Sequence, residues 1–221
     1  LSWGWSNDGQ IPFMMLKKIE KFNFNQKKNI LFEIRPHRNY PKRTEILESQ
    51  YQTYRYYDQC TKLLGKLRGT SIEKNFIVKL SPKGYAFKEE EMFKNVNSKV
   101  KFANRYSPMT EIRKDASLLI FSTISTGHLE AASSNYPFMI LNVYPNYFKN
   151  EIKELFEEMK ELGILHDNAE DIFEMLKKIE NNIYSWWSAK PLQNFISKYT
   201  KNFAKIENDQ KLQKLKGHFK F

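Results

Sequence analysis

Short apolar runs of strand length recur through the middle of the chain. They are rich in β-branched and aromatic residues, and their apolar character is nearly continuous rather than alternating with polar positions. Runs of this kind are typical of strands buried on both faces of a parallel sheet. We predict five strands, at Asn29–Ile34, Asn75–Leu80, Val100–Ala103, Ser117–Phe121 and Phe138–Val143. After Val143 we expect no further strand.

Stretches with helical character separate these runs and follow the last of them. The helices expected between the strands are Thr44–Leu67, Lys88–Asn95, Pro108–Lys114 and Ser125–Ser134. Strands that alternate with helices are typical of βαβ units and a doubly wound sheet. Three more helices are expected at Asn150–Leu162, from an Asn168 cap to Ile183, and from Pro191 to Ile206, with Trp186-Trp187 packing the last onto the sheet. The predicted fold class is therefore α/β, a Rossmann-like doubly wound parallel sheet with a helical C-terminal annex.

Composition excludes several other classes of protein. Hydrophobic residues make up 41% of the 221 residues, which is enough for a packed core and excludes wholesale disorder. No apolar run approaches the roughly 18–20 residues of a membrane-spanning helix. The single cysteine, Cys60, offers neither an internal disulfide nor a zinc site, which suits a reducing cytosol.

The charge of the chain indicates an anionic partner without identifying it. The net charge is +11 and the isoelectric point is about 9.5, which suits nucleic acid, anionic lipid or a phosphorylated small molecule. There is no dinucleotide-binding glycine motif, Walker loop, nucleophile elbow or Cys/His cluster with metal-ligand spacing. A nucleophilic or metal-dependent hydrolase is therefore disfavoured. Basic stretches are not interleaved with aromatics as in single-strand nucleic-acid binders, so we expect no nucleic-acid partner.

The most informative stretch lies where the fourth predicted strand meets the following helix. In open α/β sheets, ligands bind beyond the carboxyl ends of the strands, where a helix N-terminus attracts phosphate. The turn offers hydroxyl donors, a glycine that permits close approach, and a carboxylate for a ribose about one turn into the helix: Ser122, Thr123, Ser125, Thr126, Gly127 and Glu130. The alternative is a simple helix cap, with Glu130 as a capping-box partner.

Two further turns follow the second and first predicted strands. Lys79 and Lys83 belong to the turn KLSPKG, and Arg35 and Arg38 to the turn RPHRNY. Because the carboxyl ends of parallel strands share one edge, all three turns are expected to face one crevice, with the arginines as phosphate ligands. His37 and His128 lie in these turns, and His128 is a candidate for acid–base chemistry or for phosphate binding.

The order of these pieces resembles the C-terminal domain of a GT-B glycosyltransferase. The resemblance rests on KLSPKG, then DASLLIFSTISTGHLEAASSNYPFMIL, then ELGILHDNAEDIFEMLKKI and the tryptophan pair, and it extends to about residue 206. More narrowly, the chain resembles bacterial surface-carbohydrate transferases of the O-antigen type. Their second half begins near a TWGW…IP segment, which here is Ser2-Trp3-Gly4-Trp5 through Ile11-Pro12.

The resemblance implies a donor-binding half of an enzyme with two Rossmann-like domains. By analogy, donor phosphate is contacted by Ser122, Thr123, Ser125, Thr126 and Gly127, and the ribose by Glu130. The departing nucleotide phosphate is stabilised by Arg35, Lys79 and Lys83. GT-B enzymes have no obligatory metal, so neither a metal nor a separate cofactor is expected. The catalytic base and most acceptor contacts usually come from an N-terminal domain, which we expect to be missing here, so the chain alone is expected to bind donor without turnover.

Several points stay open after the resemblance. Some CMP-sugar transferases of this fold carry His-Pro where this chain has Ser81-Pro82, so CMP-, UDP-, GDP- and CDP-linked donors all remain candidates. The expected acceptor is a lipid-linked or free saccharide. Two alternatives are a CDP-polyol phosphotransferase of the teichoic-acid type, and a non-catalytic basic module that binds nucleic acid or anionic membrane.

The expected organisation is one domain flanked by two short segments. Residues 1–24 form a lead-in, 25–206 the nucleotide-sugar-binding domain with its helices, and 207–221 a basic tail. The lysine-rich tail suits peripheral contact with an anionic membrane. We therefore expect a cytoplasmic protein that contacts the inner face of the plasma membrane.

Overall fold

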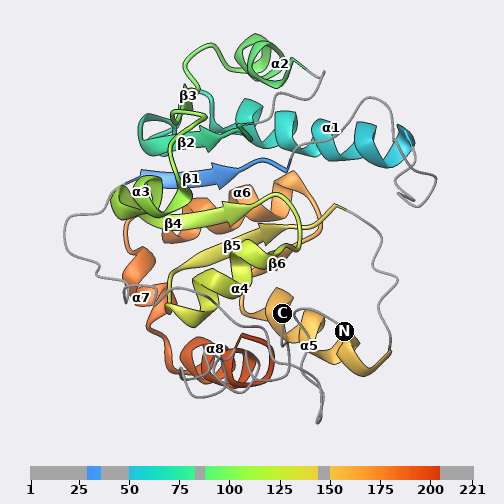
Figure 1. The fold of residues 1–221 in the computed structure, drawn as a ribbon, viewed down its shortest axis with the longest axis vertical. Helices are drawn as coiled ribbons and strands as arrows, with labels where there is room; N and C mark the ends of the chain where they lie inside the picture. Colours follow the sequence, from blue (N-terminus) through green and yellow to red (C-terminus); the bar gives the residue numbers. More distant parts are fainter. Residues whose placement is uncertain (1–28, 36–49, 83–87, 144–149, 205–221) are drawn as a thin grey trace, which may run out of the picture.

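A six-stranded parallel sheet forms the centre of the molecule (Figure 1). The structure is a computed structural model that describes residues 29–35, 50–82, 88–143 and 150–204. The strands lie in the order β3-β2-β1-β4-β5-β6, and every neighbouring pair is parallel. Their bounds are β1 Asn29–Glu33, β2 Phe76–Lys79, β3 Lys101–Phe102, β4 Ala116–Phe121, β5 Phe138–Leu141 and β6 Leu165–His166.

The strand order creates a switch point in the middle of the sheet. From β1 the chain adds β2 and β3 on one side, and then returns to place β4, β5 and β6 on the other. The carboxyl ends of β1 and β4 are therefore neighbours from which the chain leaves in opposite directions, which is where ligands bind in doubly wound sheets. All six residues of β4 and all four of β5 are buried, as continuous apolar runs in such a sheet require.

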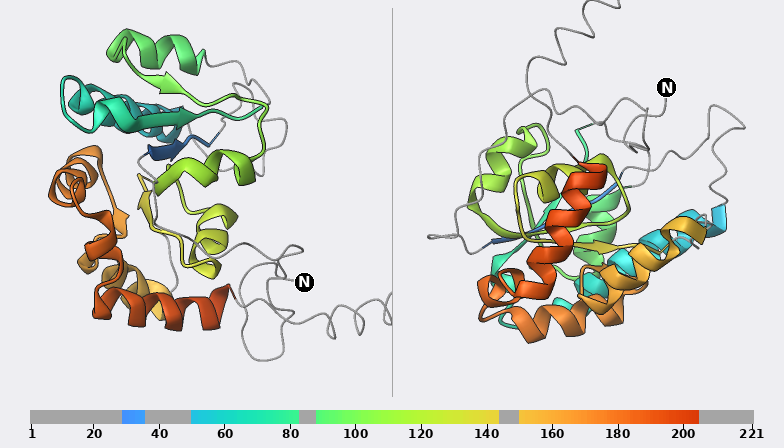
Figure 2. Two further views of the ribbon diagram at one scale, coloured as in Figure 1. Left: turned by 90° about the vertical axis from the view of Figure 1, so that its left-hand side faces the viewer. Right: turned by 90° about the horizontal axis from the view of Figure 1, so that it is seen from below.

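Helices cover both faces of the sheet (Figure 2). One face packs on α1 and α6, with Phe93 of α2 in the same core, and the other packs on α4, α5, α7 and α8. The α-helices are α1 Gln50–Leu67, α2 Glu89–Val96, α3 Met109–Ile112, α4 Thr126–Ser133, α5 Asn150–Glu161, α6 Ala169–Ile179, α7 Ile183–Trp187 and α8 Lys190–Phe203. Two short 3-10 helices, η1 Glu73–Asn75 and η2 Arg113–Asp115, lead directly into β2 and β4.

The fold class predicted from sequence is confirmed, and so are the five predicted strands. The expectation that strands end after Val143 is wrong, because Leu165 and His166 form β6 at the sheet edge. A strand of two residues leaves almost no periodic signal in the sequence. The helix that Asn168 caps ends at Ile179 rather than Ile183, and α7 follows as a separate turn.

Trp187 of α7 packs the C-terminal helices against the sheet, together with the buried residues of α8. Its ring lies edge-on to Phe138 of β5 with centroids 5.5 Å apart, and its indole N–H donates to the backbone oxygen of Asn135 at 3.1 Å. The side chain is fully buried. This contact confirms the predicted packing role of the tryptophan pair.

Some predicted features lie outside the described residues. They include the lead-in segment 1–24, the basic tail 207–221, Lys83, and the part of the RPHRNY turn that holds His37 and Arg38. Across the described part of the chain, no helix combines the length and the apolar character needed to cross a membrane.

Candidate functional site

A cavity of about 440 Å³ opens at the carboxyl ends of β1, β2 and β4. These are the strands on either side of the switch point, so the cavity lies where the sheet topology predicts a ligand. It is lined by three chain segments and one residue of α3: Glu33, Ile34 and Arg35; Lys79, Leu80, Ser81 and Pro82; Phe121, Ser122, Thr123, Ile124 and Ser125; and Met109.

The N-cap residue of α4, Ser125, lines this cavity, and the first turn of the helix follows directly behind it. Ser125 is the N-cap and forms a capping box with His128, whose Nδ1 accepts the backbone N–H of Ser125 at 3.1 Å. The amides of Thr126 and Gly127, the first two helical residues, have no intrahelical acceptor because of their position. They carry the positive end of the helix dipole toward the carboxyl edge of the sheet.

Gly127 has a packing role that the sequence did not indicate. A Cβ at this position would lie 2.8 Å from Cε1 of the buried Phe121 ring, closer than such contacts allow. The absent side chain lets the start of α4 press against the end of β4. Close approach of the helix to the strand is thus one reason for glycine here.

Ser122 joins the ends of β1 and β4. Its Oγ accepts the backbone N–H of Arg35 at 2.9 Å and lies 2.6 Å from the hydroxyl of Tyr56, which donates to it from α1. Ser122 and Tyr56 are both buried. The oxygen of Ser122 therefore serves first to fix the shape of the cavity floor.

His128 is held inside the protein rather than in the cavity. It is 2% exposed, its Nδ1 is occupied by Ser125, and its Nε2 lies 2.8 Å from the hydroxyl of Tyr199 in α8. Burial lowers the pKa of His128 to about 4, so the ring is neutral near pH 7. Since both nitrogens have protein partners, the geometry supports a structural role, and we do not assign acid–base chemistry to His128.

Lys79 lines the cavity, but its ammonium group contacts the loop after β3. Its Nζ donates to the backbone oxygens of Asn104 and Arg105 at 3.0 and 2.6 Å, so it ties the loop after β3 to the end of β2. Burial lowers the pKa of this lysine. The side chain that was expected to meet phosphate thus holds a neighbouring loop. Arg35, whose side chain is exposed, also lines the cavity.

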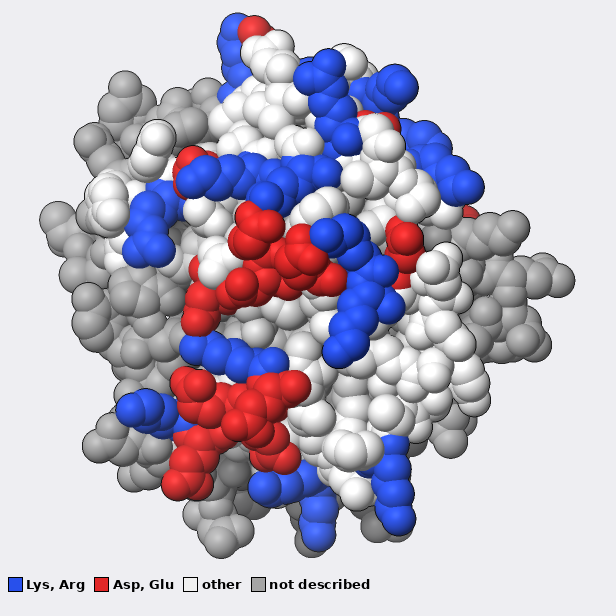
Figure 3. Space-filling view, turned by 180° about the vertical axis from the view of Figure 1, so that it is seen from behind, with Lys and Arg blue, Asp and Glu red and all other residues white. Residues whose placement is uncertain are grey.

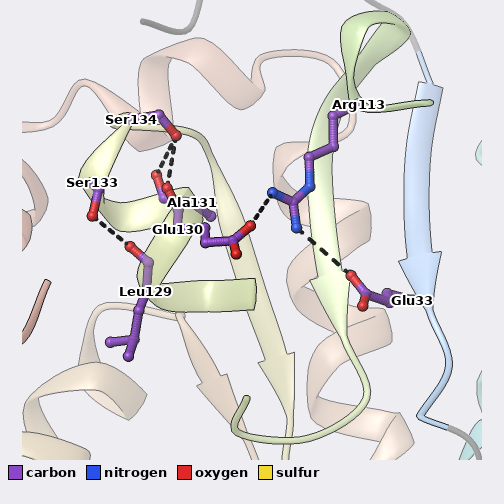
Figure 4. Close-up of polar contacts among 7 residues, drawn as sticks. All are labelled: Glu33, Arg113, Leu129, Glu130, Ala131, Ser133 and Ser134. Carbon is purple, nitrogen blue, oxygen red and sulfur yellow. Dashed lines mark hydrogen bonds and ion pairs between the residues drawn. The ribbon is translucent and has the colours of Figure 1, made fainter. Parts of the chain in front are cut away.

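Glu130 belongs to an ion cluster beside the cavity (Figure 4). Arg113, from η2, lies between two carboxylates: its Nη1 is 3.0 Å from Oε2 of Glu130, and its Nη2 is 3.9 Å from Oε2 of Glu33. Glu130 is not among the described residues that line the cavity, whereas Glu33 is. Burial raises the pKa of Glu33, an effect that the positive charge of Arg113 only partly offsets.

Of the predicted site residues, Arg35, Lys79, Ser122, Thr123 and Ser125 come together around one cavity. Thr126, Gly127 and Glu130 follow in α4 but do not line it. Among the described residues there is no group of three or more His, Cys, Asp or Glu side chains that could hold a metal ion.

The sequence pattern did not predict a role for Glu33 or Arg113. A signal was present for Glu33, because the apolar strands ILFEI and FIVKL each contain one charged residue at the same position. The parallel register pairs Glu33 with Lys79 and with Phe121, so all three lie at one level of the sheet. Arg113 had no comparable signal, since it lies in a polar segment before β4.

Comparison with known proteins places the chain in a family. The family model described as LIC12162 family transferase matches residues 1–219. The chain belongs to the LIC12162 family of transferases. Membership confirms the prediction of a transferase, and it covers almost the whole of the sequence. No curated protein matches this LIC12162 family chain.

Solved structures with a similar arrangement share little sequence with this LIC12162 family member. The wall teichoic acid polymerase TagF has a TM-score of 0.47 at 12% identity, over 86% of this chain and 41% of its own. MnaA of S. aureus with UDP has a TM-score of 0.43 at 14% identity, over 84% of this chain and 48% of its own. UDP-GlcNAc 2-epimerase of Neisseria meningitidis bound to UDP-GlcNAc has a TM-score of 0.41 at 11% identity, over 80% of this chain and 44% of its own. The chain spans less than half the length of each, and similarities at this level do not determine a substrate.

Proposed function

We propose that this domain binds the nucleotide-sugar donor of a glycosyltransferase that builds a surface polysaccharide. The observation that carries the proposal is the cavity at the switch point, which is lined by the ends of β1, β2 and β4 and by Ser125, the N-cap of α4. Membership of a transferase family supports group-transfer chemistry. The resemblance of the sequence to GT-B donor domains supports a sugar nucleotide as the ligand.

The start of α4 suits a diphosphate. Thr123 and Ser125 line the cavity, and the first two amides of the helix, at the positive end of its dipole, follow directly after Ser125. Arg35 adds a guanidinium, which can bind phosphate through two parallel hydrogen bonds. In this arrangement the departing nucleotide phosphate is stabilised by fixed dipoles and one arginine rather than by Lys79.

The face formed by α1 and α6 does not have the charge distribution of a general basic surface. On the face formed by α1 and α6, basic and acidic side chains are interleaved (Figure 3). Ion pairs such as Lys66 with Glu170 and Lys177 with Glu174 join them. This face therefore offers no continuous basic patch on which a nucleic acid or an anionic membrane would dock.

Calorimetric titration with CMP, CDP, UDP, GDP and CDP-glycerol tests the proposal. We expect at least one to bind with millimolar or better affinity, and Arg35→Gln to weaken it by about tenfold, the loss of one charge-assisted contact. Arg68→Gln is the matched control, since Arg68 is exposed after the end of α1, at the opposite edge of the sheet. Folded protein that binds none of the five would exclude the proposed function. Preference for CDP-glycerol would instead favour transfer of a polyol phosphate.

A further inference from the structure

Glu33 is an unusual group to find in a cavity suited to phosphate. Of the described residues that line the cavity, it is the one that carries a carboxylate. A negative charge close to a bound diphosphate would repel it unless the carboxylate has a task of its own. Glu33 is also not an ordinary surface residue, because it ends the central strand β1 and is paired in register with Lys79 of β2 and Phe121 of β4.

Among the described residues, the neighbouring cations Lys79 and Arg113 leave Glu33 without a close partner. Lys79 is engaged by the two backbone oxygens of the loop after β3. Arg113 makes its short contact with Glu130 and stands 3.9 Å from Glu33, beyond hydrogen-bond distance. Oε2 of Glu33 is shielded from solvent and has no hydrogen-bond partner in the part of the chain that the structure describes, and the same is true of Nε of Arg113.

The exposed part of Glu33 faces the cavity. Its side chain is 34% exposed, and the residue lines the cavity together with Arg35 and Thr123. Arg113 lies between Glu33 and Glu130 (Figure 4) and does not line the cavity, and its positive charge favours the ionised form of Glu33. An ionised carboxylate accepts hydrogen bonds and donates none, so the exposed part of this side chain suits a ligand hydroxyl as its donor.

From this geometry we infer that Glu33 binds hydroxyl groups of the donor, acting as the residue that distinguishes a hydroxyl-bearing phosphorylated ligand from a bare phosphate. The inference rests on the proposed function. It assigns to β1 the hydroxyl contact that the sequence pattern gave to Glu130, whose carboxylate is occupied by Arg113 and does not line the cavity. The hydroxyls belong either to the ribose or to the transferred sugar.

The test compares ligands that share phosphate but differ in hydroxyls. For wild type and Glu33→Gln, dissociation constants are measured for inorganic pyrophosphate, for the nucleoside diphosphate that binds wild type best, for its 2′,3′-dideoxy analogue and for its sugar nucleotide. Glu33→Gln keeps the shape of the side chain and removes its charge. We expect hydroxyl-bearing ligands to weaken about tenfold, the loss of a hydrogen bond to a charged group, and pyrophosphate to bind as well or more tightly.

Two further variants separate recognition from general charge. Glu33→Asp keeps the charge but shortens the reach, and should weaken hydroxyl-bearing ligands without improving pyrophosphate. Glu111→Gln is the matched control, because Glu111 is exposed on the nearby helix α3. It should change the affinity neither for hydroxyl-bearing ligands nor for pyrophosphate.

The binding data distinguish a contact with the ribose from a contact with the transferred sugar. A loss in Glu33→Gln that appears with the nucleoside diphosphate but not with its dideoxy analogue assigns the contact to the ribose, and a loss confined to the sugar nucleotide assigns it to the transferred sugar. Equal changes for pyrophosphate and for all hydroxyl-bearing ligands would overturn the inference and leave Glu33 as a counter-charge for Arg113. Wild type that binds no nucleotide refutes the proposed function itself, which is a different result.

Discussion

The buried histidine of the α4 cap predicts a specific dependence of stability on pH. The pKa of His128 is about 4 in the folded protein, against 6.5 for an ordinary histidine, because burial disfavours its charged form. Between these two values the unfolded chain binds a proton that the folded protein does not. The free energy of unfolding must therefore fall as the pH falls from 6.5 toward 4.

The size of the effect follows from the shift. Each pH unit within the window is equivalent to about 1.4 kcal/mol, so His128 should contribute a loss of about 2 kcal/mol by pH 5. Below about pH 4 both states are protonated and the loss stops growing. For a domain of this size, 2 kcal/mol is a large share of the total stability.

Urea unfolding at pH 7.5 and pH 5.0 measures the effect in wild type and in His128→Gln. Glutamine suits this position of a capping box and does not titrate, so it retains an acceptor for the amide of Ser125. We expect wild type to lose about 2 kcal/mol more than the variant between the two pH values. The buried His166, whose pKa is also lowered by burial, is present in both proteins and cancels. Parallel losses in the two proteins would refute the burial and pairing of His128 described above.

Three further substitutions test the framework of the cavity. Gly127→Ala should lower the unfolding free energy by about 1–2 kcal/mol, because the new Cβ meets a buried ring, and an unchanged or higher stability in urea would contradict this. Tyr56→Phe removes the hydroxyl that joins the ends of β1 and β4, and should cost about 1–3 kcal/mol, whereas the exposed Tyr54→Phe should cost less than about 0.5. Lys79→Met leaves two backbone oxygens without their donor and should cost about 1–3 kcal/mol in the same assay, against little change for the exposed Lys99→Met. Equal effects in either matched pair would show that the buried contact is not formed.

The sequence predicted the layers of the fold because buried parallel strands leave a strong signal. Runs such as SLLIF and FMIL are too short for helices and too apolar for an exposed position, so their place in the sheet centre follows almost directly. At β6 the signal fails because two residues make too short a run, and the pairing with β5 comes from tertiary packing alone.

The candidate site could be predicted in position but not in detail. That three turns share one edge follows from the parallel sheet, and five of the predicted residues do meet around one cavity. Which atoms of these residues point into it depends on partners far apart in sequence. Lys79 is engaged by the loop after β3, His128 by Tyr199 and Glu130 by Arg113, and none of these pairs has a sequence pattern that joins its members.

We propose that the start of α4 holds the phosphates of a nucleotide at the switch point of the sheet. The most direct test is a crystal structure of the protein with the tightest-binding nucleotide. We expect phosphate oxygens within hydrogen-bond distance of the backbone amides of Thr126 and Gly127, with the side chain of Arg35 in contact with the same phosphates. A nucleotide bound away from the ends of β1 and β4, with the first turn of α4 untouched, would contradict it.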